Sequence, residues 1–286
     1  MTRADHGYCS LMSTALTVDR LQPGDHACLT FSDPEERLDL LAAFVADGLA
    51  QGDTVVCYSD DADGLRDELH ERTDSAVRVE PVARLWGDSG PAARTMVDRL
   101  TEELAGAGRR LRITADTCWA ARPHANAEQL LAFESEVAGL FEAGRLTAMC
   151  QYDRESFDPV TLAYAARVHP RTIAAAVYHE DPVVRICRQH VPPGVRVAGE
   201  LDYTRAEALS DALAEAVRLD RDVHLNLNHL RFIDAGAAGV ILRTAAGLPE
   251  TRRMVVTCTE PVNRTLTTAG AAEIPNLRML VRDGDR

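Results

Sequence analysis

The sequence contains no lysine: all 31 basic residues are arginine, against 44 acidic residues. This absence excludes a Schiff-base lysine, a lysine general base and the lysine of a phosphate-binding P-loop. The formal net charge is −13, and residues 1–190 hold most of the acidic excess, with 19 basic and 31 acidic side chains. Because an acidic surface repels phosphate backbones, we expect no nucleic-acid partner.

The sequence also lacks an apolar run of about 18 residues, the length that could cross a membrane. Its first residues show neither the basic nor the apolar region of a signal peptide. The cysteines lack C-x-x-C spacing and are scattered, which is typical of free thiols in a reducing compartment; they are Cys9, Cys28, Cys57, Cys118, Cys150, Cys187 and Cys258. We therefore expect a cytoplasmic protein without a membrane partner, and a homodimer is compatible with these patterns.

Apolar strand patterns alternate with amphipathic helical patterns from residue 26 to residue 178, where a last strand is expected over 172–178. Asp33 as N-cap, Pro34 at the first helical position and Glu36 predict the first helix start. The alternation predicts an α/β fold with a mainly parallel sheet. The connection between the first strand and helix has no glycine and holds three acids, so ATP hydrolysis through a P-loop is not expected, and no cofactor is assigned.

The strongest boundary signal is Val-Pro-Pro-Gly at residues 191–194, which interrupts both helix and sheet. It separates a first domain over residues 21–190 from a smaller α/β domain over 191–286. The polar and small residues over 1–20 predict an N-terminal tail.

Two segments of the smaller domain occur together in a specific order. Gly199-Glu-Leu-Asp-Tyr-Thr204 joins a strand to a helix, and His224–Leu242 runs through Asp-Ala-Gly-Ala-Ala-Gly into another helix. This pair resembles the STAS domain of anti-sigma-factor antagonists. The resemblance implies binding to an anti-sigma factor or a kinase-type regulator, through Glu200, Asp202, Asp234, Ala235, Gly236 and Gly239. From the residues alone, Asp234 can be a simple helix cap, and Glu200 and Asp202 a solvated turn.

The sequence departs from that family at two points. The residue after the loop aspartate is often a serine that a kinase-type anti-sigma factor phosphorylates, whereas here it is Ala235. We therefore expect a partner-binding domain without the usual phosphoserine switch. The family also begins with a longer pair of strands, and residues 190–197 leave room for only one. Two alternatives stay open: the first domain supplies the missing strand, or the strand is lost.

Five collinear segments of the first domain resemble the MEDS sensory domain (methanogen/methylotroph, DcmR): Gly24–Phe31, Phe44–Asp53, Leu111–Ala120, Cys150–Arg154 and His169-Pro170. The resemblance covers about residues 20–180. It implies a degenerate RecA/KaiC-like α/β unit that senses a simple organic molecule.

Candidate ligand-binding side chains gather on the expected strands. His26 and Cys28 share one strand face, as do Cys150 and Tyr152, and ligands of open α/β sheets bind at the carboxyl ends of strands. With Trp119 and His169 they predict a small, mostly apolar pocket for an organic ligand.

A metal or haem is an open alternative for His26, Cys28, Cys150 and His169. Tight cysteine pairs typical of zinc sites are absent, and buried cysteines commonly behave as small hydrophobes, so no metal is assigned.

We therefore expect a cytosolic signalling and transcription regulator that is not an enzyme, and whose first domain senses a small ligand or a redox or metal cue. A catalytic α/β protein acting on a small organic substrate and a pure protein-binding scaffold remain alternatives. No nucleophile elbow supports the catalytic interpretation.

Overall fold

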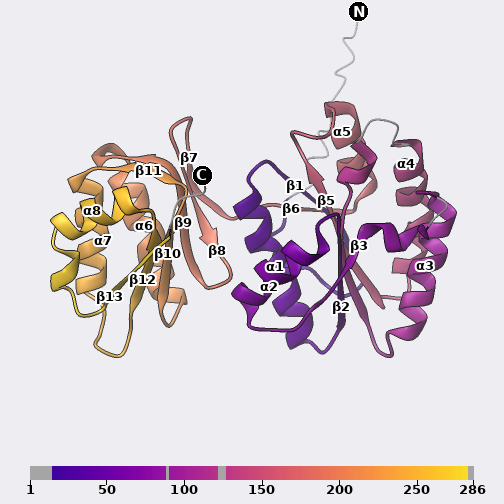
Figure 1. Cartoon of the computed structure of the whole chain (residues 1–286), viewed down its shortest axis with the longest axis horizontal. Helices are drawn as coiled ribbons and strands as arrows, with labels where there is room; N and C mark the ends of the chain where they lie inside the picture. Colours follow the sequence, from indigo (N-terminus) through magenta and orange to yellow (C-terminus); the bar gives the residue numbers. More distant parts are fainter. Residues whose placement is uncertain (1–14, 88–89, 122–126, 283–286) are drawn as a thin grey trace, which may run out of the picture. The chain divides into compact units, whose positions relative to one another are not determined.

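The computed structural model describes residues 15–87, 90–121 and 127–282, which form two compact units (Figure 1). The first unit is built on a six-stranded, wholly parallel sheet in the order β3-β2-β4-β5-β1-β6. Its strands are β1 (His26–Phe31), β2 (Thr54–Ser59), β3 (Arg78–Pro81), β4 (Leu111–Asp116), β5 (Leu146–Asp153) and β6 (Arg171–Ile173).

Helices cover this sheet, with α1 and α2 on one side and α3 and α4 on the other (Figure 1). They are α1 (Pro34–Ala50), α2 (Ala62–Thr73), α3 (Ala93–Gly106), α4 (Ala127–Glu136) and α5 (Pro159–Val168), with 3-10 turns at Val18–Arg20, Val82–Leu85, Cys118–Ala121 and Val137–Phe141. The start of α1 agrees with the sequence, because the Asp33 carboxylate accepts hydrogen bonds from the Glu35 and Glu36 amides and Pro34 follows it. The predicted α/β fold with a mainly parallel sheet is confirmed.

The second unit is a smaller mixed α/β sheet in the order β13-β12-β10-β9-β8-β7, with β11 paired to β9. Strands β7 and β8, and β8 and β9, are antiparallel, and the other pairs are parallel. The elements are β7 (Val177–Glu180), β8 (Val184–Gln189), β9 (Gly194–Leu201), α6 (Ala206–Leu219), β10 (Val223–Leu227), β11 (Leu230–Ile233), α7 (Ala235–Ala246), β12 (Met254–Cys258), α8 (Glu260–Thr268) and β13 (Leu277–Val281), with 3-10 turns at Tyr203–Arg205 and Ala271–Glu273.

The structure corrects the strand expected over residues 172–178. This segment is two strands in different sheets: β6 pairs with β1 in the first sheet, and β7 pairs with β8 in the second. The second sheet therefore begins at Val177, before the expected junction at 191–194. The β7–β8 hairpin supplies the entry strands, and it lies in the part of the chain that the sequence assigns to the first domain over residues 21–190.

Gly199 of β9 allows the backbone to approach Val183, the residue before β8, closely. Its φ is +100°, and a Cβ built on it would lie 2.1 Å from the Val183 carbonyl oxygen. Only glycine combines this conformation with this approach. The backbone conformation and this close contact therefore explain why the STAS-like segment begins with a glycine at position 199.

The N-terminal tail also needs correction at its end. Residues 1–14, including Cys9, lie outside the described residues. The Leu16 amide, however, donates to the Thr172 carbonyl oxygen at 2.8 Å, and Val18 is buried. The first domain thus includes chain from about residue 16. No helix in the described ranges is both long and apolar enough to cross a membrane.

Candidate functional site

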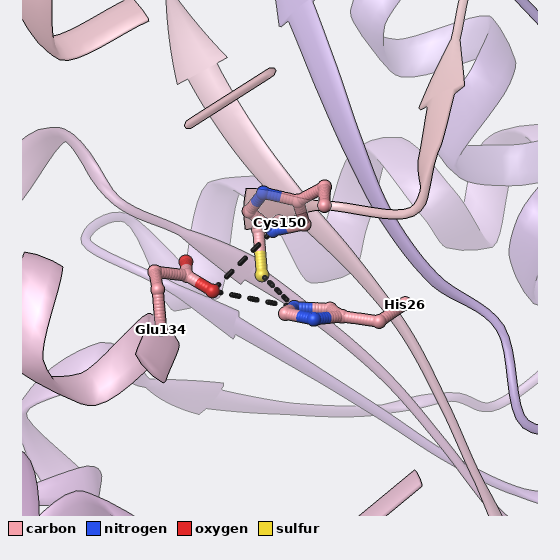
Figure 2. A group of neighbouring side chains, drawn as sticks. His26, Glu134 and Cys150 are labelled. Atoms are coloured by element: carbon pink, nitrogen blue, oxygen red, sulfur yellow. Dashed lines mark hydrogen bonds and ion pairs between the residues drawn. The ribbon is translucent and has the colours of Figure 1, made fainter. Parts of the chain in front are cut away.

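Four buried side chains from four separate elements meet in the first domain. His26 comes from β1, Glu134 from α4, Cys150 from β5 and His169 from the residue that ends α5. One donor atom from each lies within 4.8 Å of all the others, and each residue is at most 5% exposed. We call this group the four-residue cluster; Figure 2 shows the Glu134 carboxylate and the Cys150 thiol turned toward the His26 ring.

The distances in the cluster are short and similar. His26 Nε2 lies 3.3 Å from Glu134 Oε2 and 3.5 Å from Cys150 Sγ, and His169 Nε2 lies 3.4 Å from Glu134 Oε2. The two strands are neighbours, with His26 in register with Ala148, two residues before Cys150. Since side chains two apart on a strand share a face, the sheet itself turns both groups toward α4.

Glu134 is the anionic centre of the cluster. Its Oε1 accepts a hydrogen bond from the Tyr152 hydroxyl at 2.6 Å. Burial alone would raise the pKa of Glu134, but the His169 and His26 rings and the Tyr152 hydroxyl together lower it to about 2. Glu134 is therefore ionised although it is buried, so the cluster must hold a compensating positive charge.

A backbone carbonyl fixes the orientation of the His169 ring. Its Nδ1 lies 2.7 Å from the Ala165 carbonyl oxygen, which can only accept, so Nδ1 carries a proton. Burial lowers the pKa of His169, and the charge of Glu134 opposes this effect. His169 Nε2 faces Glu134 Oε2 at 3.4 Å, and neither atom has a hydrogen-bond partner. A proton on Nε2 or a bound cation would offset the buried charge of Glu134 at this place.

Burial, followed by the neighbouring Glu134 charge, raises the pKa of the Cys150 thiol well above its usual value. On its own the thiol therefore stays protonated and poorly nucleophilic. The cluster does not resemble an activated cysteine nucleophile.

The cavity beside the cluster is small. It measures about 20 Å³ and is bordered by apolar side chains together with His26 and Cys150. This is room for about one water molecule, whereas sites for organic ligands measure about 300–1,000 Å³. A larger open groove of about 780 Å³ lies beside Tyr58, but its charged side chains pair with one another, as in Arg84–Glu80 and Arg99–Glu102.

The structure brings four of the six predicted ligand-binding residues together: His26, Cys150, Tyr152 and His169. Cys28 is in register with Cys150, but its Sγ lies 3.7 Å from Thr172 Oγ1 and borders neither cavity. Trp119 also lies outside both linings and packs against Trp86, with ring centroids 4.9 Å apart. It belongs to the core of this domain.

Glu134 is not among the residues predicted from the sequence. Its signal is an acid on the apolar face of a helix, four residues after Leu130 and three before Val137, both of which are buried. Such a position predicts a buried charge that needs a partner.

In the STAS-like domain, Asp234 connects two segments. Its Oδ1 caps α7 by accepting from the Ala237 amide at 2.8 Å, as the sequence predicts, and its Oδ2 accepts from the Tyr203 amide at 2.8 Å. Ala235 and Gly236 are both exposed at the start of α7. A Cβ on Gly236 would lie 3.0 Å from Tyr203 Cβ, so the tyrosine lies against this helix start.

The surroundings of this helix start include two exposed aromatic side chains, with Tyr203 73% and Phe232 51% exposed. We call Glu200, Tyr203, Arg231, Phe232, Ala235 and Gly236 the α7 surface. Glu200 is exposed and pairs with Arg231 at 3.5 Å. Of the other predicted partner residues, Asp202 accepts from the Thr204 amide as a turn residue, and Gly239 lies half-buried against Arg243.

Comparisons with known proteins agree with this division. Residues 25–170 match the family described as the methanogen/methylotroph, DcmR sensory (MEDS) domain, and residues 184–280 match the Mlab, STAS domain.

Similar solved structures include the flagellar accessory protein FlaH from Methanocaldococcus jannaschii, at 14% identity over 59% of this chain and 79% of that chain, with a TM-score of 0.41. A solved ATPase domain is 8% identical over 63% of this chain and 82% of that chain, with a TM-score of 0.39. A DnaB-like replicative helicase is 8% identical over 62% and 57% of the two chains, with a TM-score of 0.36.

The MEDS match covers just over half of the 286 residues, and a STAS domain follows it; the chain therefore belongs to the MEDS family of sensory-domain proteins.

Proposed function

We propose that this protein is a cytoplasmic, non-enzymatic regulator in which the MEDS domain senses a small ligand and the STAS domain binds an anti-sigma factor or a kinase-type regulator. The presence of both domains supports a signalling role. The observation that carries the partner-binding half is the α7 surface, where Tyr203 and Phe232 expose large apolar areas beside Ala235. Exposed aromatic groups next to polar ones are typical of protein interfaces.

Ala235 sets the mode of signalling. The methyl group stands exposed at the first position of α7, where related antagonists carry the serine that becomes phosphorylated. A methyl group cannot accept phosphate, so binding there is constitutive or is controlled by the MEDS domain. Control by the MEDS domain requires the ligand to bind one state of the protein more tightly than the other.

The start of α1 supports a non-enzymatic role for the MEDS domain. In nucleotide-hydrolysing α/β proteins, the free amides of the corresponding loop and helix start hold phosphates. Here the Asp33 carboxylate accepts from two of these amides, at 2.9 and 3.1 Å. Its negative charge repels a phosphate at the same place.

The partner-binding half is tested by calorimetric titration of the full chain with each kinase-type anti-sigma factor of the source organism. We expect one of them to bind, and Tyr203→Ser and Phe232→Ser each to weaken the complex at least about tenfold, the effect of a hot-spot residue. The control is Leu219→Ser, which changes another exposed apolar residue at the far end of α6. Failure of every regulator to bind, or equal binding by all three variants and the unchanged protein, would contradict the proposal.

A further inference from the structure

We infer that the four-residue cluster of the MEDS domain binds a divalent transition-metal ion of the Zn²⁺ type through His26 Nε2, Glu134 Oε2, Cys150 Sγ and His169 Nε2. This inference rests on the sensing half of the proposed function and names its ligand class. It is independent of partner binding by the STAS domain.

The spacing of the donor atoms supports a tetrahedral site. Zinc bonds of about 2.0–2.1 Å to nitrogen, 2.0–2.2 Å to oxygen and 2.3 Å to sulfur give tetrahedral edges of about 3.3–3.6 Å. The pairs His26–Glu134, His169–Glu134 and Cys150–His26 measure 3.3, 3.4 and 3.5 Å. An ion at the centre of these atoms would need only small movements of the side chains, since all four donors already lie within 4.8 Å of one another.

The hydrogen bonds around the cluster are those of a metal site. His169 donates Nδ1–H to the Ala165 carbonyl oxygen, which leaves Nε2 free to coordinate, and Tyr152 donates to the second oxygen of Glu134. Metal-bound histidines and carboxylates are usually oriented by such outer partners. Two of the four donor atoms, Glu134 Oε2 and His169 Nε2, have no hydrogen-bond partner, so each is available to an ion.

The charge and the chemistry of the donors select the class of ion. A thiolate, a carboxylate and two neutral imidazoles carry a total charge of −2, so a divalent ion makes the buried site neutral. Thiolate and imidazole ligands favour zinc and related transition metals over Mg²⁺ and Ca²⁺. Four protein ligands leave no open position, which indicates a sensing or structural site rather than a catalytic one.

The size of the cavity also favours an ion. The 20 Å³ beside the cluster holds about one water molecule and is too small for haem or for an organic ligand of ordinary size. A bare ion needs no pocket beyond its four ligands.

The test uses the full chain, treated with a chelator and then titrated with Co²⁺ and with Zn²⁺. We expect one Co²⁺ per chain, with the intense visible bands of a tetrahedral site and a thiolate-to-cobalt charge-transfer band, and loss of both when one equivalent of Zn²⁺ is added. Weak octahedral bands without thiolate charge transfer, or no uptake of the ion, would overturn the inference.

Three variants locate the site. Cys150→Ser should abolish the charge-transfer band, and Tyr152→Phe should keep the band but weaken Zn²⁺ binding about 10–100-fold, the usual effect of losing an outer partner. Cys28→Ser is the matched control, because its thiol lies on the neighbouring strand but is turned to Thr172. Equal binding by Cys150→Ser, or loss of the band in Cys28→Ser, would overturn the assignment. Neither result depends on whether the STAS domain binds its partner.

Discussion

Replacing Tyr152 with phenylalanine removes one buried hydroxyl and leaves the ring in place. The hydroxyl donates to the ionised Glu134 carboxylate at 2.6 Å, and Tyr152 is 1% exposed. Hydrogen bonds to buried charged groups contribute about 1.5–3 kcal/mol to stability. We therefore expect Tyr152→Phe to lower the unfolding free energy of the MEDS domain, measured without metal, by about 2 kcal/mol.

Urea unfolding of the full chain, followed by tryptophan fluorescence, measures this effect. Both tryptophans, Trp86 and Trp119, lie in the MEDS domain, so the signal reports this domain alone. The control is Tyr164→Phe, whose hydroxyl lies 3.1 Å from Ser135 Oγ in an exposed pair. We expect the control to change stability by less than about 0.5 kcal/mol.

A double-mutant cycle with Glu134→Gln tests the cause. A neutral acceptor makes a weaker bond, so Tyr152→Phe should cost only about 0.5–1.5 kcal/mol in the Gln background. If Tyr152→Phe is as stable as the unchanged protein, or if its cost is the same in both backgrounds, the Glu134 carboxylate is not the buried anion described here.

Three further predictions concern single side chains. A Cβ on Gly48 would lie 2.5 Å from Cδ of the fully buried Arg112, so Gly48→Ala should lower the unfolding free energy by about 1–2 kcal/mol in the fluorescence assay. The control Gly106→Ala, with nothing within 4 Å of its Cβ, should be neutral or stabilising; equal effects of the two substitutions would contradict this packing. Asp181 accepts two amide bonds in the β7–β8 turn and also contacts Arg205, and these contacts hold its pKa well below the ordinary value. A lowered carboxyl pKa stabilises the fold above the ordinary value of about 4, and this effect is lost as the pH falls from there through the lowered pKa. Asp181→Asn should therefore lower the thermal stability of the STAS domain at pH 7, and in circular dichroism the difference should shrink as the pH falls below about 4; a difference independent of pH would refute this. Ala235→Asp should weaken the regulator complex by placing a charge on the α7 surface, and unchanged affinity would show that the partner binds elsewhere.

The strands and helices that are predictable from the sequence are those with strong local patterns. The Asp33-Pro34 helix start agrees with the structure because capping residues act locally. The alternation of strands and helices from residue 26 also agrees, because apolar runs and amphipathic patterns are local signals. The prediction over 172–178 was wrong because its apolar run continues through a change of sheet. Periodicity shows that residues are buried but not which sheet they join.

The candidate site was predictable from the sequence only in part. His26, Cys150, Tyr152 and His169 stood out through their residue types and the expected strand ends. Glu134 did not, because its importance depends on how α4 packs over β1 and β5. The four donors come from residues far apart in the chain, so the spacing rule for zinc pairs could not detect them. Trp119 was misplaced because an indole beside a strand end can face the core as readily as a pocket.

The most direct test of the proposed signalling mode is an intact-mass measurement of the full chain after incubation with its binding kinase-type regulator and ATP. We predict that the protein forms the complex and keeps its unmodified mass, because Ala235 offers no hydroxyl at the start of α7. Stoichiometric phosphate on the STAS domain would contradict this signalling mode.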